Sequence, residues 1–206
     1  MLFKNRYNAG KLLAAKLSSY KNKKDVIILG IPRGGIEVAS ALAKELNAKL
    51  SVIITKKITY PSNPEFAVGA ASMDSYVIDE GYKHAEKQLK DDIKKLMSEI
   101  RERYKKYTNG KIPILKGKTI IIADDGLATG HTMLAAIKYA RSKKPKKIIA
   151  AIPVSSQEAY EAVKKLADKI ICLNIPINFF AVGNFYQEFG QLTDEDVISY
   201  LKENKK

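Results

Sequence analysis

Two adjacent carboxylates, Asp124 and Asp125, end an apolar run and precede a short loop of small residues. The loop contains Gly126 and Gly130, and Thr132 begins a helical pattern. A strand, a tight loop and a helix N-terminus in this order present free backbone N–H groups to an anion. Ionised carboxylates beside them accept hydrogen bonds from hydroxyl groups. The segment predicts a ligand with a phosphate and either hydroxyls or a metal, the alternative being an ordinary strand-to-helix turn.

A second glycine-rich loop, Gly30-Ile31-Pro32-Arg33-Gly34-Gly35, also follows an apolar run and opens a helical pattern. Consecutive glycines let the backbone approach an anion closely, and an arginine can bind that anion. Lys56 and Lys57 follow the next apolar run. Each of these signals is weak alone, because a plain turn or a solvated strand exit would account for it. Beside the first motif, they predict a second anion position.

The elements that must position these residues alternate between strand-like and helical patterns, which favours an α/β fold with a mostly parallel sheet flanked by helices. We expect one domain over residues 1–206. Its core would run from about 1 to 174, and a small C-terminal hood or lid and a last helix would occupy about 175–206. The hood is rich in aromatics, which either fill a core or stack on a planar base. The patterns predict strands at 26–29, 51–55, 119–123, 147–152 and 169–173, a hairpin at 66–78, and helices at 9–19, 36–46, 84–107 and from a Thr193 or Asp194 cap to about 201.

Composition narrows the class of protein further. The 206 residues are 46% hydrophobic and 28% charged, as in soluble globular domains, and no apolar stretch approaches the length that spans a membrane. The single Cys172 excludes an intramolecular disulfide and predicts a cytoplasmic protein. The formal net charge of +14 would attract nucleic acid or a small polyanion alike.

The acidic segment resembles the 5-phosphoribosyl-1-pyrophosphate (PRPP) binding motif of type I phosphoribosyltransferases. The resemblance covers nearly the whole chain and is closest to phosphoribosyltransferases of uncertain substrate. Five motifs carry it, in this order: Phe3-x-x-Arg6-x-x-Ala9-Gly10, Pro32-Arg33-Gly34-Gly35, Asn63-Pro64-Glu65, Asp124-Asp125-Gly126-x-Ala128-Thr129-Gly130 and Ala181-Val182-Gly183-x-x-Tyr186-x-x-Phe189.

The resemblance implies a role for each group of residues. Asp124 and Asp125 would hold the ribose hydroxyls, with Asp125 nearer the incoming nucleophile, and Arg33 would complete the catalytic set. The resemblance also implies a non-proline cis peptide in the second loop, a mobile loop at 61–70 that closes over PRPP, and a homodimer. The 5-phosphate would lie on Ala128, Thr129, Gly130, His131 and Thr132, the pyrophosphate on Arg33, Gly34, Gly35, Lys56 and Lys57, and the acceptor against Phe180 and Tyr186.

The predicted activity is transfer of a phosphoribosyl group from PRPP to a nitrogen acceptor, such as a nucleobase, with release of pyrophosphate. Mg²⁺ would be held mainly by the ligand and water, because this ion keeps several of its waters. His131 would either hydrogen-bond the phosphate or point to solvent, and His84 would lie on the surface. The alternative is a non-catalytic regulator that senses PRPP or a nucleotide, with or without nucleic-acid binding, although no helix-turn-helix or RNA-binding motif accompanies the basic charge.

Overall fold

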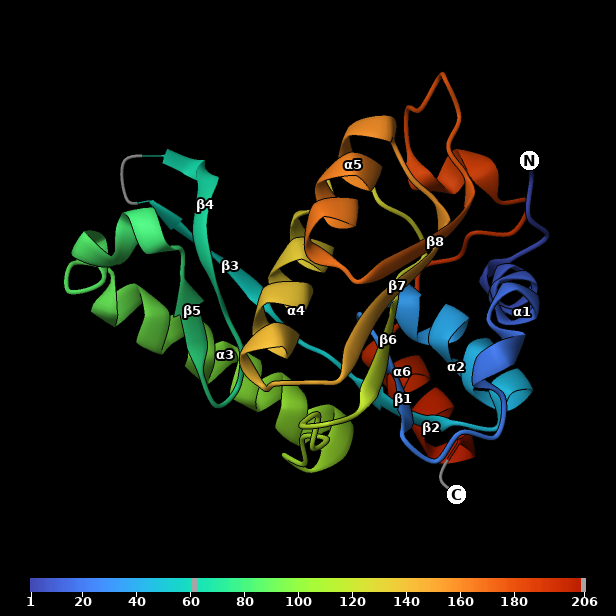
Figure 1. Cartoon of the computed structure of the whole chain (residues 1–206), viewed down its shortest axis with the longest axis horizontal. Coiled ribbons are helices and arrows are strands. Elements are labelled where there is room, and N and C mark those ends of the chain that lie inside the picture. Colours follow the sequence, from blue (N-terminus) through green and yellow to red (C-terminus); the bar gives the residue numbers. More distant parts are fainter. Residues whose placement is uncertain (61–62, 205–206) are drawn as a thin grey trace.

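Two sheets organise the computed structural model, which describes residues 1–60 and 63–204 (Figure 1). The larger sheet is parallel throughout, as the apolar runs predicted, and its strand order is β2-β1-β6-β7-β8. The strand predicted at 51–55 begins and ends earlier than expected. The bounds are β1 Val26–Gly30, β2 Lys49–Val52, β6 Thr119–Ala123, β7 Lys147–Val154 and β8 Lys169–Asn174.

Helices cover both faces of this sheet, which explains why its central strands are continuously apolar. Successive strand residues point to opposite faces, so Ile121 packs in one core with Leu42, whereas Ile122 packs in the other with Met133. The first core takes side chains from α1 Arg6–Lys16, α2 Gly34–Leu46 and α6 Asp194–Glu203, and the second from α4 His131–Ser142 and α5 Gln157–Leu166.

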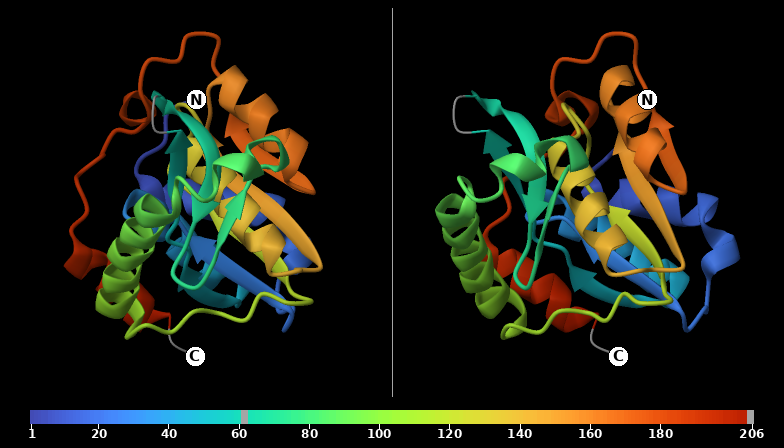
Figure 2. Two further views of the ribbon diagram at one scale, coloured as in Figure 1. Left: turned by 90° about the vertical axis from the view of Figure 1, so that its left-hand side faces the viewer. Right: turned by 60° about the vertical axis from the view of Figure 1, so that its left-hand side comes forward.

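A smaller antiparallel sheet, with the order β3-β4-β5, stands to one side of the main sheet (Figure 1). Its strands are β3 Lys56–Tyr60, β4 Asn63–Ala71 and β5 Tyr76–Ile78. The β4–β5 pair is the predicted hairpin, and β3 is a further strand that the sequence patterns did not predict. Figure 2 shows the long helix α3, Lys90–Thr108, running beside this sheet. Pro61 and Ser62, in the loop predicted to close over PRPP, lie outside the described residues.

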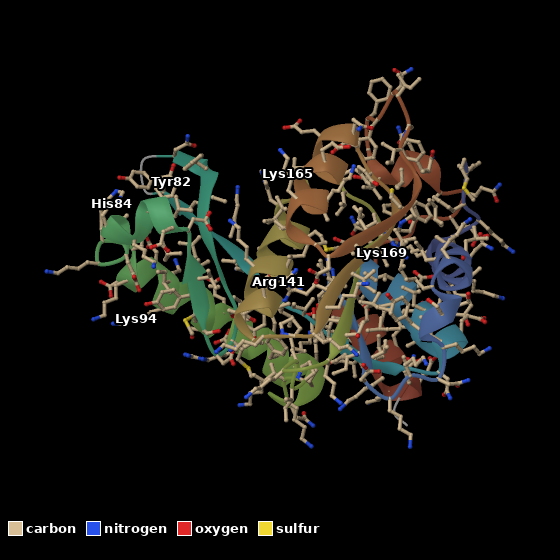
Figure 3. All side chains as sticks on the ribbon, viewed as in Figure 1. Tyr82, His84, Lys94, Arg141, Lys165 and Lys169 are labelled. Atoms are coloured by element: carbon tan, nitrogen blue, oxygen red, sulfur yellow. The ribbon has the colours of Figure 1, made fainter. Side chains whose placement is uncertain are left out.

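The helix predicted at 84–107 begins later than expected. Residues Glu80–Ala85 form a separate 3₁₀ helix, η2, and α3 starts only at Lys90. The ring of Tyr82 packs edge-on against Tyr60 and Phe66, which ties η2 to the antiparallel sheet. This tertiary contact outweighs the helical period of the sequence. Figure 3 shows Tyr82 and His84 together at the outer end of this part of the molecule, and His84 is exposed, as predicted.

The segment predicted to form a hood brings distant parts of the chain together. Phe3 bridges to Tyr186, and the N–H groups of Gln187 and Glu188 donate to the carbonyls of Phe3 and Lys4. A 3₁₀ helix, η3 Val182–Phe185, lies within the hood. The Thr193 side chain caps α6, which settles the choice of cap that the sequence left open.

Within the described ranges, no helix combines the length and apolar character needed to cross a bilayer.

Candidate functional site

The two glycine-containing loops leave neighbouring strands at the same edge of the sheet. Strands β1 and β6 pair in parallel, with Gly30 opposite Ala123 at their carboxyl ends. Strand β2 lies beyond β1 and β7 lies beyond β6, so the chain turns away in opposite directions from this point. In open parallel sheets, ligands bind in the crevice at such a switch point. The strand order alone therefore brings both predicted anion loops to one position.

The loop after β6 surrounds a hollow of about 200 Å³. Gly130 has a φ of 76°, a left-handed conformation that favours glycine, and it precedes α4 without a side-chain cap among the described residues. The first N–H groups of α4 therefore remain available to an anion. Ser156 fixes the loop from the far side, since its Oγ donates to the Ala128 carbonyl over 2.7 Å. The five residues predicted to bind the 5-phosphate all line this hollow: Ala128, Thr129, Gly130, His131 and Thr132.

The acidic pair packs directly against the glycine pair of the other loop. A Cβ atom at Gly34 would lie 1.9 Å from Asp125 Oδ2, and one at Gly35 would lie 2.7 Å from the Ala123 carbonyl oxygen. A side chain at Gly35 would therefore clash with backbone atoms, and one at Gly34 would displace the Asp125 carboxylate. The peptide bond between Pro32 and Arg33 is cis, as the resemblance implied, and Arg33 is exposed at the start of α2.

The two carboxyl groups differ in their surroundings. Burial, reinforced by the neighbouring charge of Asp125, raises the pKa of Asp124 well above its usual value. Asp124 Oδ1 accepts a hydrogen bond from the Asp125 N–H at 2.9 Å. Asp124 also lines the hollow of the phosphate loop. A ligand that brings hydroxyl donors or a cation to this position would favour the ionised form of Asp124.

The predicted lysine pair faces the phosphate loop across a cleft of about 510 Å³. Lys56 and Lys57 line one side of this cleft, and Thr129, His131 and Thr132 line the other. Lys56 forms an ion pair with Glu99 of α3, so an anionic ligand would have to compete with that carboxylate.

One polar atom beside this cleft lacks a partner. Thr55 lines the cleft, and its Oγ1 is buried without a hydrogen bond in the described part of the chain. A buried hydroxyl without a partner costs about 1–3 kcal/mol.

One of the two predicted acceptor contacts, Tyr186, is buried within the hood. Tyr186 is only 6% exposed because its ring packs between Phe3 and Phe189, and its hydroxyl donates to the Asp125 carbonyl at 2.6 Å. In this arrangement the ring offers no face to a base, so the prediction that Tyr186 stacks on the acceptor is wrong here. Phe180 is 85% exposed and remains a predicted acceptor contact. Val182 touches the phosphate loop, where a Cβ at Gly126 would lie 2.5 Å from its Cγ1.

A buried arginine that the site prediction omitted lies behind the acidic pair. Arg6 Nε donates to Asp125 Oδ2 at 2.8 Å, and the arginine side chain is only 7% exposed. Arg6 stands in the first of the five motifs, so the residue itself was visible in the sequence. Its contact was not, because 119 residues separate it from Asp125.

The acidic pair is also the part of the site where a divalent cation would fit. Among the described residues, no group of three or more His, Cys, Asp or Glu side chains could enclose a metal ion. Two carboxylates beside a phosphate-binding loop suit an ion such as Mg²⁺, which binds through one or two carboxylates and its ligand's phosphates.

A parallel sheet with two glycine-containing loops at its switch point, and an acidic pair between them, is an α/β arrangement that suits a phosphorylated ligand. The family model for the phosphoribosyl transferase domain matches residues 2–188. The chain therefore belongs to the phosphoribosyl transferase family, as the motifs indicated.

Individual relatives agree with this assignment. The chain is 35% identical over 206 residues to the candidate phosphoribosyl transferase Rv0571c of Mycobacterium tuberculosis. This alignment covers 97% of this chain and 46% of that protein. The chain thus spans about half the length of the curated relatives it matches. It is 36% identical to the crystal structure of TT1426 from Thermus thermophilus, with a TM-score of 0.92 over 98% of this chain and 99% of that one. The AQ2163 protein from Aquifex aeolicus, 17% identical with a TM-score of 0.52 over 82% of this chain and 74% of that one, shares the fold alone.

Proposed function

We propose that this protein transfers the phosphoribosyl group of PRPP to a nitrogen acceptor, such as a nucleobase, and releases pyrophosphate. The observation that carries the proposal is the shared cleft, in which Lys56 and Lys57 face Thr129, His131 and Thr132. One phosphate at the loop and a second anion at the lysines match the two ends of PRPP. The acidic pair lies next to the phosphate loop, where the ribose hydroxyls would be.

Each group of residues has a part in the proposed reaction. Residues 128–132 hold the 5-phosphate through N–H groups and threonine hydroxyls. Asp124 and Asp125 accept hydrogen bonds from the ribose hydroxyls. Arg33, Lys56, Lys57 and the backbone at Gly34 and Gly35 bind the pyrophosphate and stabilise the charge that grows on it as it leaves.

The bond between ribose C1 and the pyrophosphate oxygen breaks and its electron pair leaves with pyrophosphate, while the acceptor nitrogen forms a new bond to C1 and gives its proton to water. The negative charges of Asp124 and Asp125 offset the positive charge that develops at C1. A Mg²⁺ ion would be held mainly by the ligand and water beside Asp124 and Asp125, and it would supply positive charge that stabilises the leaving pyrophosphate.

Calorimetry with PRPP and Mg²⁺, followed by a pyrophosphate-release screen, tests the proposal. The screen covers purines, pyrimidines, xanthine-type bases and non-base amines. We expect Lys57→Met to weaken pyrophosphate binding about tenfold, as expected for the loss of one charge-assisted contact. Lys94→Met is the matched control, because Lys94 lies on the outer part of the molecule (Figure 3). Tight, salt-dependent nucleic-acid binding without pyrophosphate release would instead support the alternative, a non-catalytic regulator.

Two further expectations belong to this proposal. The family resemblance implies a homodimer, which sedimentation of the purified protein tests. The lone cysteine predicts a cytoplasmic location, which fractionation of the source cells tests.

A further inference from the structure

Arg6 makes four contacts behind the acidic pair, and two of them belong to the hood. Its Nε donates to Asp125 Oδ2 at 2.8 Å, and its NH1 donates to the Gly190 carbonyl at the same distance. The guanidinium stacks over the Phe189 ring, 3.7 Å from its centre, and lies 4.0 Å from Glu37. Arg6 therefore joins the first helix, the acidic pair and the hood in one buried cluster.

A second connection runs from the hood to the same aspartate. The Tyr186 hydroxyl donates to the Asp125 carbonyl at 2.6 Å, and the Tyr186 ring stacks on Phe189, the ring that Arg6 also contacts. Arg6 of α1, which itself contacts the hood, thus holds the side chain of Asp125, and Tyr186 of the hood holds its backbone carbonyl. A movement of the hood would change the position of this carboxylate.

Stability alone is a poor explanation for such a cluster. Removing two charges from water costs free energy that their attraction often fails to recover, so an apolar pair would hold the hood as well. The planar guanidinium, however, fixes a carboxylate in one orientation through a directed N–H group. Arg6 takes Oδ2 of Asp125, which leaves Oδ1 to meet a ribose hydroxyl.

We infer that Arg6 is a positioning residue that orients Asp125 for the ribose and couples this orientation to the hood. The inference rests on the proposed function for the identity of the ligand, but the coupling of Asp125 to the hood does not depend on turnover. Binding of the ribose at Asp125 would then order the hood, and loosening the hood would weaken ribose binding.

The first test separates ribose binding from pyrophosphate binding. Calorimetry compares PRPP with Mg²⁺ against pyrophosphate with Mg²⁺, for Arg6→Met, Arg6→Lys and the control Arg141→Met. Arg141 pairs with Asp168 near the far end of α4 (Figure 3), so its loss removes an ion pair away from the site. We expect Arg6→Met to weaken PRPP binding about 10- to 100-fold, as expected for the loss of the hydrogen bond between Asp125 and a ribose hydroxyl. Pyrophosphate binding should stay within about twofold.

Arg6→Lys keeps the charge but loses the directed Nε–H group, so it should recover part of the PRPP affinity. It also decides the test if Arg6→Met fails to fold. Equal weakening of PRPP and pyrophosphate by Arg6→Lys, or no weakening of either, would overturn the inference.

The second test needs no ligand. Hydrogen exchange is measured at two N–H groups of the hood, those of Gln187 and Glu188. They donate to the carbonyls of Phe3 and Lys4 near the N-terminus of the chain. Asp125→Asn weakens the contact to Arg6, so it should speed exchange at these two amides relative to Arg141→Met. Unchanged exchange would refute the coupling. If the wild-type protein binds no PRPP while the exchange result holds, the proposed function fails and the coupling stands.

Discussion

Replacing Gly34 with alanine should displace the Asp125 carboxylate while leaving both aspartates in the sequence. The new Cβ would lie 1.9 Å from Asp125 Oδ2 and 3.1 Å from Arg6 Nε. Asp125 must therefore move, and its hydrogen bond to Arg6 is lost or distorted. The backbone at Gly34 does not require a left-handed conformation, so the effect comes from space alone.

The magnitude follows from two contributions. Overpacking of a filled position costs about 1–3 kcal/mol, and a hydrogen bond between charged groups contributes about 1.5–3 kcal/mol. Their sum centres near 4 kcal/mol. In a chain of this size, each kcal/mol shifts the melting temperature by about 2–4 °C. We therefore expect Gly34→Ala to melt roughly 12 °C below the wild type.

Thermal unfolding followed by circular dichroism, with Gly81→Ala as the control, measures this shift. A Cβ at Gly81 would meet no atom within 4 Å, so the control should melt close to the wild type. PRPP binding by the folded Gly34→Ala protein should fall as well, because Asp125 is displaced. Equal melting temperatures of Gly34→Ala and Gly81→Ala would contradict the inferred close packing of Gly34 against Asp125.

Three more predictions concern single side chains. Thr55→Val removes a buried hydroxyl that has no hydrogen-bond partner among the described residues, so it should raise the free energy of unfolding by about 1 kcal/mol. Denaturant unfolding measures this change, and an unchanged or lower free energy would contradict the reasoning. Asp125→Asn should abolish pyrophosphate release while keeping an oxygen that can accept from Arg6, whereas Asp125→Ala leaves the buried Arg6 without its hydrogen-bonded carboxylate and should cost about 3–5 kcal/mol; equal melting of the two variants would contradict this. Burial raises the pKa of Asp168, but hydrogen bonds from Arg141 and the Ile148 N–H outweigh it, so the pKa lies below its usual value. The stability that Asp168 contributes is therefore present above about pH 4 and lost as the pH falls through its folded pKa, and Asp168→Asn should be less stable than wild type at pH 7 but converge with it in acid unfolding curves.

The parallel sheet and its two loops could be predicted because their signals are local. Strands buried on both faces are continuously apolar, and the glycines and carboxylates follow directly after β1 and β6. Gly126, Gly130 and Thr132 mark the phosphate loop within a few residues of one another. No knowledge of the rest of the chain was needed to place them.

The missed features all depend on contacts between distant residues. Tyr82 packs on Phe66 and Tyr60, and the helix therefore starts later than its period indicates. Tyr186 was predicted to stack on a base because its surroundings are aromatic, yet those same aromatics bury it. Arg6 resembles any other basic residue of a helix until the fold brings it to Asp125.

The contact between Arg6 and the Gly190 carbonyl joins residues 184 positions apart in the chain. During synthesis on the ribosome, the first helix and the acidic loop would therefore emerge well before Gly190 does. Until then, Arg6 can meet Asp125 but not the hood, and the acidic pair is left with only part of its support. A nascent chain would thus build its phosphate loop first and gain a correctly oriented Asp125 only after Gly190 has emerged. Incomplete or clipped chains would then bind phosphate before they bind ribose.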